Sequence, residues 1–210
     1  MLLEEIYQQF ISGMKQTTWL EYIAVFFGIG SVWFSKKENI LVYPVGLVNT
    51  LIYIYLSVKG NLFGEASVNI YYSVMSIYGW ILWAKKDQEH RPVVHITYSS
   101  RRDWINQLGF FLGFYVVIYV CLLYLKREFA PGAVPAADAF ASATAYTGMW
   151  LMAKKKVESW YWWIATNIAS IPLYFSKGYV FTSFYYLVLL VLAIAGLVEW
   201  RRRAQSLPIA

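Results

Sequence analysis

Two tryptophans and an asparagine occur at helical spacing in the C-terminal part of the chain. Trp160, Trp163 and Asn167 lie at positions i, i+3 and i+7, so a helix would place them on one side. Indole faces attract cations within about 6 Å and stack on flat rings, and a carboxamide can hydrogen-bond the polar edge of such a ring. The spacing therefore predicts a binding face for a flat cationic ring. The alternative is that the tryptophans belong to an interfacial aromatic belt.

A second polar stripe occurs between residues 65 and 80. Its members are three or four residues apart, and they are Glu65, Asn69, Tyr72, Ser73, Ser76 and Trp80. Polar side chains at membrane depth are expensive, and they usually face a cavity or another helix. We expect the stripe to line a substrate path, the alternatives being hydrogen bonds between packed helices and, for Glu65, a surface role. Tyr146 is a further candidate for the same path.

The chain contains an internal repeat, because residues 24–60 are echoed by residues 142–178 at an offset of 118 positions. Gly30, Lys36, Lys37, Tyr43, Asn49, Lys59 and Gly60 recur as Gly148, Lys154, Lys155, Tyr161, Asn167, Lys177 and Gly178. A fixed period indicates a duplicated structural unit. The echo predicts that Asn49 lies at the depth of Asn167 and also contacts substrate, with hydrogen bonding between helices as the alternative.

The composition predicts an all-α integral membrane protein. Hydrophobic residues make up 59% of the 210 and charged residues 14%, whereas soluble domains carry roughly 25% charged residues. Several apolar stretches approach the ~20 residues that a bilayer-crossing helix needs. We expect seven transmembrane helices, at 19–35, 40–57, 66–84, 105–125, 136–153, 160–176 and 179–199. The fifth is rich in small residues, which let helices approach closely, so we place it inside the bundle.

The repeat predicts how these helices are arranged in a single transmembrane domain, residues 1–210. Each echoed unit contains three helices, one unit at 19–84 and its copy at 136–199. An odd-numbered unit followed directly by its copy would leave the copy inverted, so the linker helix at 105–125 restores the orientation. The prediction is a 3+1+3 fold of two parallel three-helix repeats, with the substrate site near the midplane between them.

Positive charge predicts the orientation in the membrane. With seven helices, 13 of the 18 lysines and arginines fall on the face that holds the C-terminus, and five fall on the other. The positive-inside rule then places the C-terminus in the cytoplasm and the N-terminus outside. The net charge of +6 is thus explained by topology beside the lipid bilayer, and no nucleic-acid partner is expected.

The sequence lacks the motifs of several other classes of function. No G-x-x-x-x-G-K-[ST] loop is present to cradle a nucleotide. Cys121 is the single cysteine, and His90 and His95 lie in one basic loop, so neither a metal site nor a cofactor is expected. No nucleophile with a base falls inside the predicted bundle, which argues against an enzyme. Since no carboxylate or histidine falls at mid-membrane, the sequence favours a uniporter over an ion-coupled carrier.

The chain resembles the PnuC vitamin transporters. The run ESWYWWIATN, which contains Trp160, Trp163 and Asn167, carries the resemblance together with LYFSKG, YYLVLLVLAIAG and SIYGWILW. The similarity extends from about residue 19 to residue 200. It implies a three-plus-one-plus-three helix fold similar to that of full-length SWEET sugar transporters. It further implies facilitated diffusion of an unphosphorylated vitamin, which a cytoplasmic kinase traps, and a homotrimer in the bacterial inner membrane.

The resemblance also bears on the site and the substrate. Trp160, Trp163 and Asn167 match the family's binding motif, and Asn49 matches the first-half asparagine. Nicotinamide riboside is the preferred substrate, and thiamine is the alternative because both contain a flat cationic ring. Many nicotinamide riboside carriers have glutamine where this chain has Asn69, Leu82 and Met149, which leaves the choice open. A second class also stays open, a membrane scaffold or receptor whose polar stripes only hold helices together.

Overall fold

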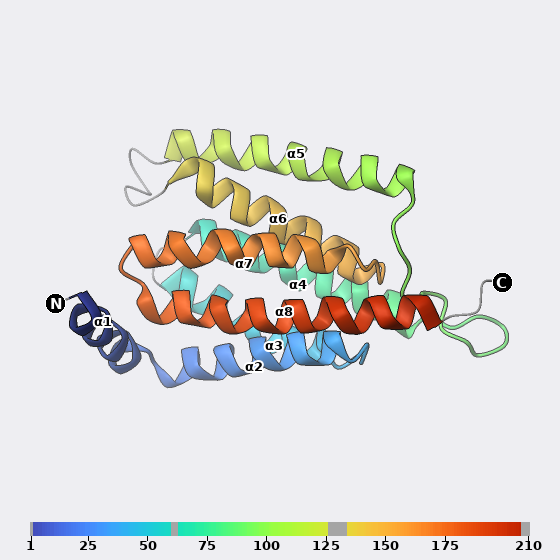
Figure 1. The fold of residues 1–210 in the computed structure, drawn as a ribbon, viewed down its shortest axis with the longest axis horizontal. Helices are drawn as coiled ribbons and strands as arrows, with labels where there is room; N and C mark the ends of the chain where they lie inside the picture. Colours follow the sequence, from blue (N-terminus) through green and yellow to red (C-terminus); the bar gives the residue numbers. More distant parts are fainter. Residues whose placement is uncertain (1, 60–62, 126–133, 207–210) are drawn as a thin grey trace.

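The computed structural model describes residues 2–59, 63–125 and 134–206, with the backbone alone at residues 2, 63–65 and 125. Within these ranges the chain is helical, and its two β-bridges are isolated (Figure 1). The helices are α1 Leu2–Gln16, α2 Trp19–Lys36, α3 Val42–Lys59, α4 Phe63–Ala84, α5 Arg101–Leu125, α6 Pro135–Ala153, α7 Ser159–Ser176 and α8 Val180–Ser206. The prediction of an all-α protein is confirmed.

Six of the helices form a closed ring. Each contacts the next in the order α2, α3, α4, α6, α7 and α8, and α8 contacts α2. The helix α5 lies outside this ring against α6, along one edge of the molecule, and α1 contacts α8 (Figure 1). We call α2–α4 the first half and α6–α8 the second half. The halves meet along two seams, where α2 packs on α8 and α4 packs on α6.

The two halves correspond at a register of 117 residues rather than 118. Helix α7 begins and ends 117 residues after α3 (159 − 42 and 176 − 59). Packing partners follow the same register, because Tyr43 lies against Gly79 and Trp160 lies against Gly196 (160 − 43 and 196 − 79). The offset of 118 matches the identical residue types of the echo, whereas the starts of α3 and α7, the starts of α4 and α8, and these contacts follow 117. The structural counterpart of Asn167 is therefore Thr50, not Asn49.

The helix α6 is the most buried element of the ring. Its small residues Ala139, Ala143, Ala145 and Gly148 are inaccessible, and it contacts α4, α5 and α7. Side chains this short let three neighbouring helices approach closely. The prediction that this helix lies inside the bundle is confirmed.

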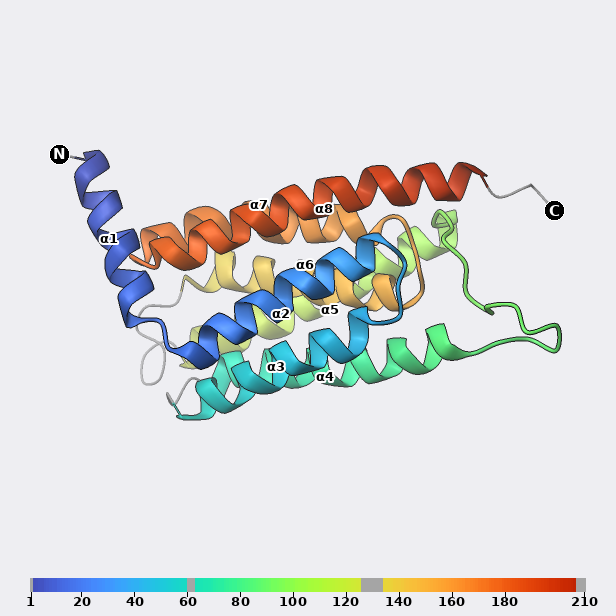
Figure 2. The same cartoon turned by 90° about the horizontal axis from the view of Figure 1, so that it is seen from below.

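The N-terminal segment forms a helix that is not among the seven predicted transmembrane helices. This helix, α1, meets α2 at an angle of 105°, so that it crosses the end of the bundle (Figure 2). Phe10 of α1 packs on Phe181 and Phe184 of α8, with ring centroids 5.8 and 5.5 Å apart. These contacts stabilise the bend.

Length and apolar composition identify fewer membrane spans than the seven expected. Among the described residues, α3, α5 and α8 are long and apolar enough to cross a membrane, and the bent pair α1–α2 raises the number to four if it forms one span. Two of the remaining ring helices carry buried small or polar residues, such as Ala143 and Thr147 in α6 and Thr166 and Ser170 in α7.

The basic loops meet at one end of the bundle, which we call the basic end. The backbone N–H of Val157 donates to the carbonyl of Thr97 at 3.0 Å, joining the loop after α6 to the loop after α4. Arg203, near the end of α8, lies 3.3 Å from Glu38 in the loop after α2. These segments therefore share one end, as the positions of Lys and Arg in the sequence predict.

Candidate substrate-binding site

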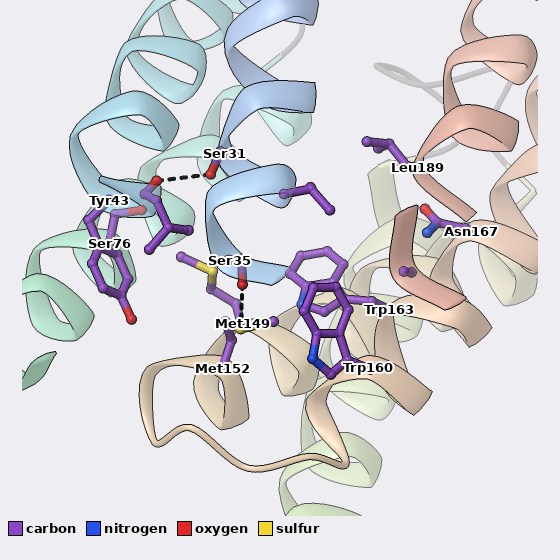
Figure 3. A pocket seen from close by; sticks show the side chains of 13 residues that line it. Ser31, Ser35, Tyr43, Ser76, Met149, Met152, Trp160, Trp163, Asn167 and Leu189 are labelled. Atoms are coloured by element: carbon purple, nitrogen blue, oxygen red, sulfur yellow. Dashed lines mark hydrogen bonds between the residues drawn. The ribbon is translucent and has the colours of Figure 1, made fainter. Parts of the chain in front are cut away.

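A cavity of about 100 Å³ lies between the two halves. Every helix of the ring contributes to its wall, and its 13 lining residues are drawn in Figure 3. The residues are Ser31, Val32, Ser35, Val42, Tyr43, Ser76, Met149, Met152, Trp160, Trp163, Asn167, Leu189 and Ala193.

Corresponding faces of the two halves enclose this cavity. Four pairs of lining residues are 117 positions apart, namely Val32 and Met149, Ser35 and Met152, Tyr43 and Trp160, and Ser76 and Ala193. One pair touches, since the Ser35 hydroxyl donates to the Met152 sulfur at 2.8 Å (Figure 3). The cavity thus lies on the approximate symmetry axis, where equivalent side chains face each other and differ in chemistry. Such a site can bind an asymmetric molecule.

Trp160 forms the end of the cavity nearest the basic loops. Its side chain is 1% exposed and meets the indole of Trp200 edge to face, with ring centroids 5.5 Å apart and planes at 88°. The ring lies directly on the backbone of Gly196, where an added Cβ would overlap it. Glycine is required there because the indole approaches the helix so closely. The position of Trp160 is therefore set by two residues of α8.

Trp163 and Asn167 continue the same face of α7. The Trp163 ring lies against Gly148 of α6, 3.2 Å from the site of an added Cβ. Asn167 is 3% exposed and lines the cavity one helical turn beyond Trp163 (Figure 3). The structure thus brings Trp160, Trp163 and Asn167 into one cavity, at the i, i+3 and i+7 positions read from the sequence.

The polar stripe of α4 reaches the cavity at Ser76, which is buried and lines it. Tyr72, one turn earlier, lies behind the wall, with its ring centroid 6.2 Å from that of Trp163 and 6.1 Å from that of Tyr146. Tyr146 stacks on Tyr71 at 4.1 Å. These tyrosines form an aromatic layer that supports Trp163 from the side away from the basic end.

Three other residues that the sequence predicts to bind substrate, Asn49, Asn69 and Trp80, lie outside the cavity lining. The Asn49 carboxamide donates to the carbonyl of Ala24 at 2.6 Å and is outside the cavity lining. A change of one residue turns a side chain by about 100° around a helix, so the register of 117 directs Asn49 toward α2. Trp80 is 40% exposed, and Asn69 also lies outside the lining. The side chain of Glu65 is not among those that the structure describes.

Tyr43 is the most informative lining residue that the sequence did not indicate. It is 1% exposed, lies on Gly79 and meets Trp83 edge to face at 5.2 Å. Its hydroxyl and the Nε1 of Trp160 are both buried without a hydrogen-bond partner in the described part of the chain. A register of 117 would have paired Tyr43 with Trp160, but the echo at 118 hid this correspondence. Ser31, Ser35, Met152 and Leu189 were also missed, and no local pattern marks them, whereas Met149 had been noted only as a position where related carriers have glutamine.

The lining determines which molecules the site can accept. Two indoles, a phenol, a carboxamide and three serine hydroxyls are present, and no lining side chain is charged. Such a wall can stack on a flat ring, attract a cation and hydrogen-bond hydroxyl groups. A phosphate dianion would find neither Arg nor Lys in the lining. No group of three or more metal-binding side chains occurs among the described residues.

Comparison with known proteins identifies relatives along nearly the whole chain. The family model described as nicotinamide mononucleotide transporter matches residues 18–202. The nicotinamide riboside transporter PnuC of Escherichia coli is 22% identical over 215 residues, which cover 93% of this chain and 90% of that protein. The riboflavin/roseoflavin transporter RibM of Streptomyces davaonensis is 22% identical over 205 residues, covering 96% and 94% of the two chains.

A solved structure shares the fold. The crystal structure of the vitamin B3 transporter PnuC superimposes with a TM-score of 0.69 at 22% sequence identity, covering 97% of this chain and 90% of the other. These relatives are transporters rather than enzymes.

Proposed function

Because the chain belongs to the nicotinamide mononucleotide transporter family, we propose that it carries an unphosphorylated vitamin with a flat cationic ring, nicotinamide riboside in preference. The observation that carries the proposal is the cavity in which Trp160, Trp163 and Asn167 meet without a charged neighbour in the lining. The indoles would stack on the pyridinium ring, and Asn167 would hydrogen-bond its carboxamide.

The uncharged wall favours the riboside over the mononucleotide that gives the family its description. A buried anion needs paired cations or several donors, and an unpaired charge is costly to bury. Lys155, in the loop after α6, lies outside the cavity lining and already pairs with Glu38. A riboside lacks the phosphate and so avoids that cost, and its ribose hydroxyls match the serine hydroxyls and the Nε1 of Trp160, which has no hydrogen-bond partner among the described residues.

The lining also favours facilitated diffusion. Ion or proton coupling normally uses carboxylate or histidine side chains at the substrate path, and the residues that line the cavity include neither. Net uptake then requires that the cell consume the free vitamin, which a cytoplasmic kinase does by adding a phosphate that the cavity rejects. The cavity of about 100 Å³ is smaller than the ~300–1,000 Å³ of sites for drug-sized ligands, so the two halves must separate before a substrate enters.

We propose the membrane arrangement predicted from the sequence. The units 19–84 and 136–199 form two parallel three-helix repeats, joined by the linker at 105–125, and seven helices cross the bilayer. The contacts of α2 with α8 and of α6 with α4 support this arrangement, because they are equivalent under the repeat. The basic end lies in the cytoplasm of a bacterial cell, the N-terminus lies outside, and the inner membrane holds a homotrimer.

Thiamine is the second candidate, because its thiazolium ring is also flat and cationic. Isothermal titration of the detergent-purified protein with nicotinamide riboside, with thiamine and, because one relative is a riboflavin transporter, with riboflavin distinguishes the candidates. Trp163→Ala should weaken binding of the true substrate about thirtyfold, since a desolvated cation–π contact contributes about 2 kcal/mol. Trp19→Ala is the matched control, because Trp19 is exposed and remote from the cavity.

The outcomes separate the proposed functions. Binding of one vitamin that is lost in Trp163→Ala and kept in Trp19→Ala supports transport through this cavity. If riboflavin alone binds, the substrate of the site is a larger, neutral ring system and not a flat cationic ring. Folded protein that binds none of the three would refute the proposal and favour a scaffold or receptor.

A further inference from the structure

Two hydrogen bonds of the same kind cross between the halves at the basic end. Trp83, near the end of α4, donates its Nε1–H to the carbonyl of Ala153 at 3.0 Å. Trp200, near the end of α8, donates its Nε1–H to the carbonyl of Ser35, also at 3.0 Å. Each tryptophan of one half thus binds the end of the first helix of the other half. The two tryptophans are 117 residues apart and their acceptors are 118 apart (200 − 83 and 153 − 35), so the two bonds lie in corresponding places of the two halves with acceptors shifted by one residue.

An ion pair lies between these two hydrogen bonds. The Nζ of Lys155 is 2.6 Å from the carboxylate of Glu38, and Lys155 is only 5% exposed. Its ammonium also lies 4.6 Å from the ring centroid of Trp83. Arg203 supplies a second cation to Glu38, at 3.3 Å. The pair therefore joins the loop after α2 to the loop after α6 through the middle of the basic end.

The backbone at both residues is unusual. Glu38 and Lys155 have φ angles of 58° and 52°, in the left-handed region that disfavours residues with a Cβ. They are 117 residues apart and hence occupy equivalent positions in the two halves (155 − 38). Equivalent positions meet at the symmetry axis, where two identical charges would repel. Opposite charges at these two positions allow the halves to pair there.

These contacts close the cavity toward the basic end. Ser35 lines the cavity and accepts the bond from Trp200, while Trp160 lines it and packs on the same tryptophan. Tyr43 and Trp160 also belong to one buried apolar cluster with Trp83 and Trp200. A molecule leaving the cavity at this end must pass between the halves, where these side chains now meet.

We propose that Glu38, Lys155, Trp83 and Trp200 form a gate that opens the cavity to the basic end when the contacts between the halves separate. This inference rests on the proposed transport function for its physiological meaning. The hydrogen bonds and ion pairs that link the halves here are few, so water can replace each of them in the open state, while the ring contact between Trp83 and Trp200, 6.2 Å between centroids, must also separate. The charge-assisted hydrogen bonds of Glu38 are the strongest of the polar contacts between the halves. Removing the charge of Glu38 should therefore raise the fraction of molecules with an open gate about tenfold.

The test measures, without any substrate, how fast a thiol reagent reaches the wall of the cavity at Ser35. Ser35→Cys places a thiol on the buried wall, in a background with Cys121→Ala, because Cys121 is exposed. A membrane-impermeant maleimide is then added to vesicles of both orientations. We expect Glu38→Gln to accelerate labelling about tenfold from the basic end and to leave labelling from the opposite side unchanged.

Asp138→Asn is the matched control for the loss of an ion pair. Asp138 and Lys177 form a bond of similar length, 2.7 Å, but both belong to the second half and lie at the opposite end. Labelling should stay at the parental rate in this variant. Equal labelling of Glu38→Gln and the parent would overturn the gate, and so would equal acceleration in both variants.

A second experiment tests the gate if Glu38→Gln lowers the yield of folded protein. Glu38→Cys with Lys155→Cys, bridged by a short bifunctional methanethiosulfonate, should abolish uptake of nicotinamide riboside and recover it on reduction. Uptake that continues through the bridged protein would overturn the gate. The labelling assay needs no substrate, so it tests the gate independently of the proposed function. If Glu38→Gln accelerates labelling in a protein that binds neither vitamin, the gate stands and only the proposed function is refuted.

Discussion

Replacing Gly196 by alanine tests how the structure positions the tryptophan at the end of the cavity. A Cβ at this position would overlap the outer edge of the Trp160 indole. The ring is 1% exposed and meets Trp200 edge to face at 5.5 Å, so it has little room to move away. The methyl group must therefore displace Trp160 or push α8 away from α7.

The magnitude follows from a comparison with Gly113→Ala on α5. Both changes replace a helical glycine by alanine, which stabilises a helix by about 1 kcal/mol. Gly113 has nothing within 4 Å of an added Cβ, so that variant shows the helix effect alone. Overpacking costs about 1–3 kcal/mol, so Gly196→Ala should be less stable than Gly113→Ala by that amount.

Thermal unfolding in detergent measures the difference. For a chain of this length, about 1–3 kcal/mol corresponds to a Tm roughly 2–12 °C lower for Gly196→Ala than for Gly113→Ala. Vitamin binding should weaken in the same variant, because the displaced indole lines the cavity. Equal Tm values for the two variants would refute the close contact between Trp160 and α8. Unchanged affinity of Gly196→Ala for the vitamin would show that Trp160 does not contribute to binding.

Three further predictions follow from the same geometry. Asn49→Ala should cost about 0.5–1.5 kcal/mol of stability by removing the hydrogen bond from Asn49 of α3 to the Ala24 carbonyl of α2, with affinity retained, whereas Asn167→Ala should mainly lower affinity; the reverse pattern in unfolding and titration would contradict the register of 117. Nicotinamide mononucleotide should not compete with nicotinamide riboside in titrations, since the lining holds no cation; effective competition would contradict the uncharged site. Asp138→Asn should lower stability by less than about 1 kcal/mol, because its ion pair with Lys177 is partly exposed, and a larger loss of Tm would show that the pair is structural.

The sequence was informative where neighbours along the chain carry the signal. The helical character of the chain, the shared face of Trp160, Trp163 and Asn167, and the common end of the basic loops all follow from local periodicity and composition. The burial of α6 follows in the same way from its small residues. The helices and the shared face depend on residue types within a few turns of one helix, and the common end of the basic loops depends on which alternate loops hold Lys and Arg, both of which the order of residues displays directly.

Tertiary structure alone decided which side chains meet across the two halves. Identical residue types predicted a register of 118, but helix starts and packing set it at 117, which turned Asn49 away from the cavity and brought Tyr43 into it. The bend of α1 depends on its contacts with α8. The pairing of Glu38 with Lys155 joins residues far apart in the chain. Such contacts result from how whole helices pack, because a rotation of one residue changes every partner while local periodicity stays the same.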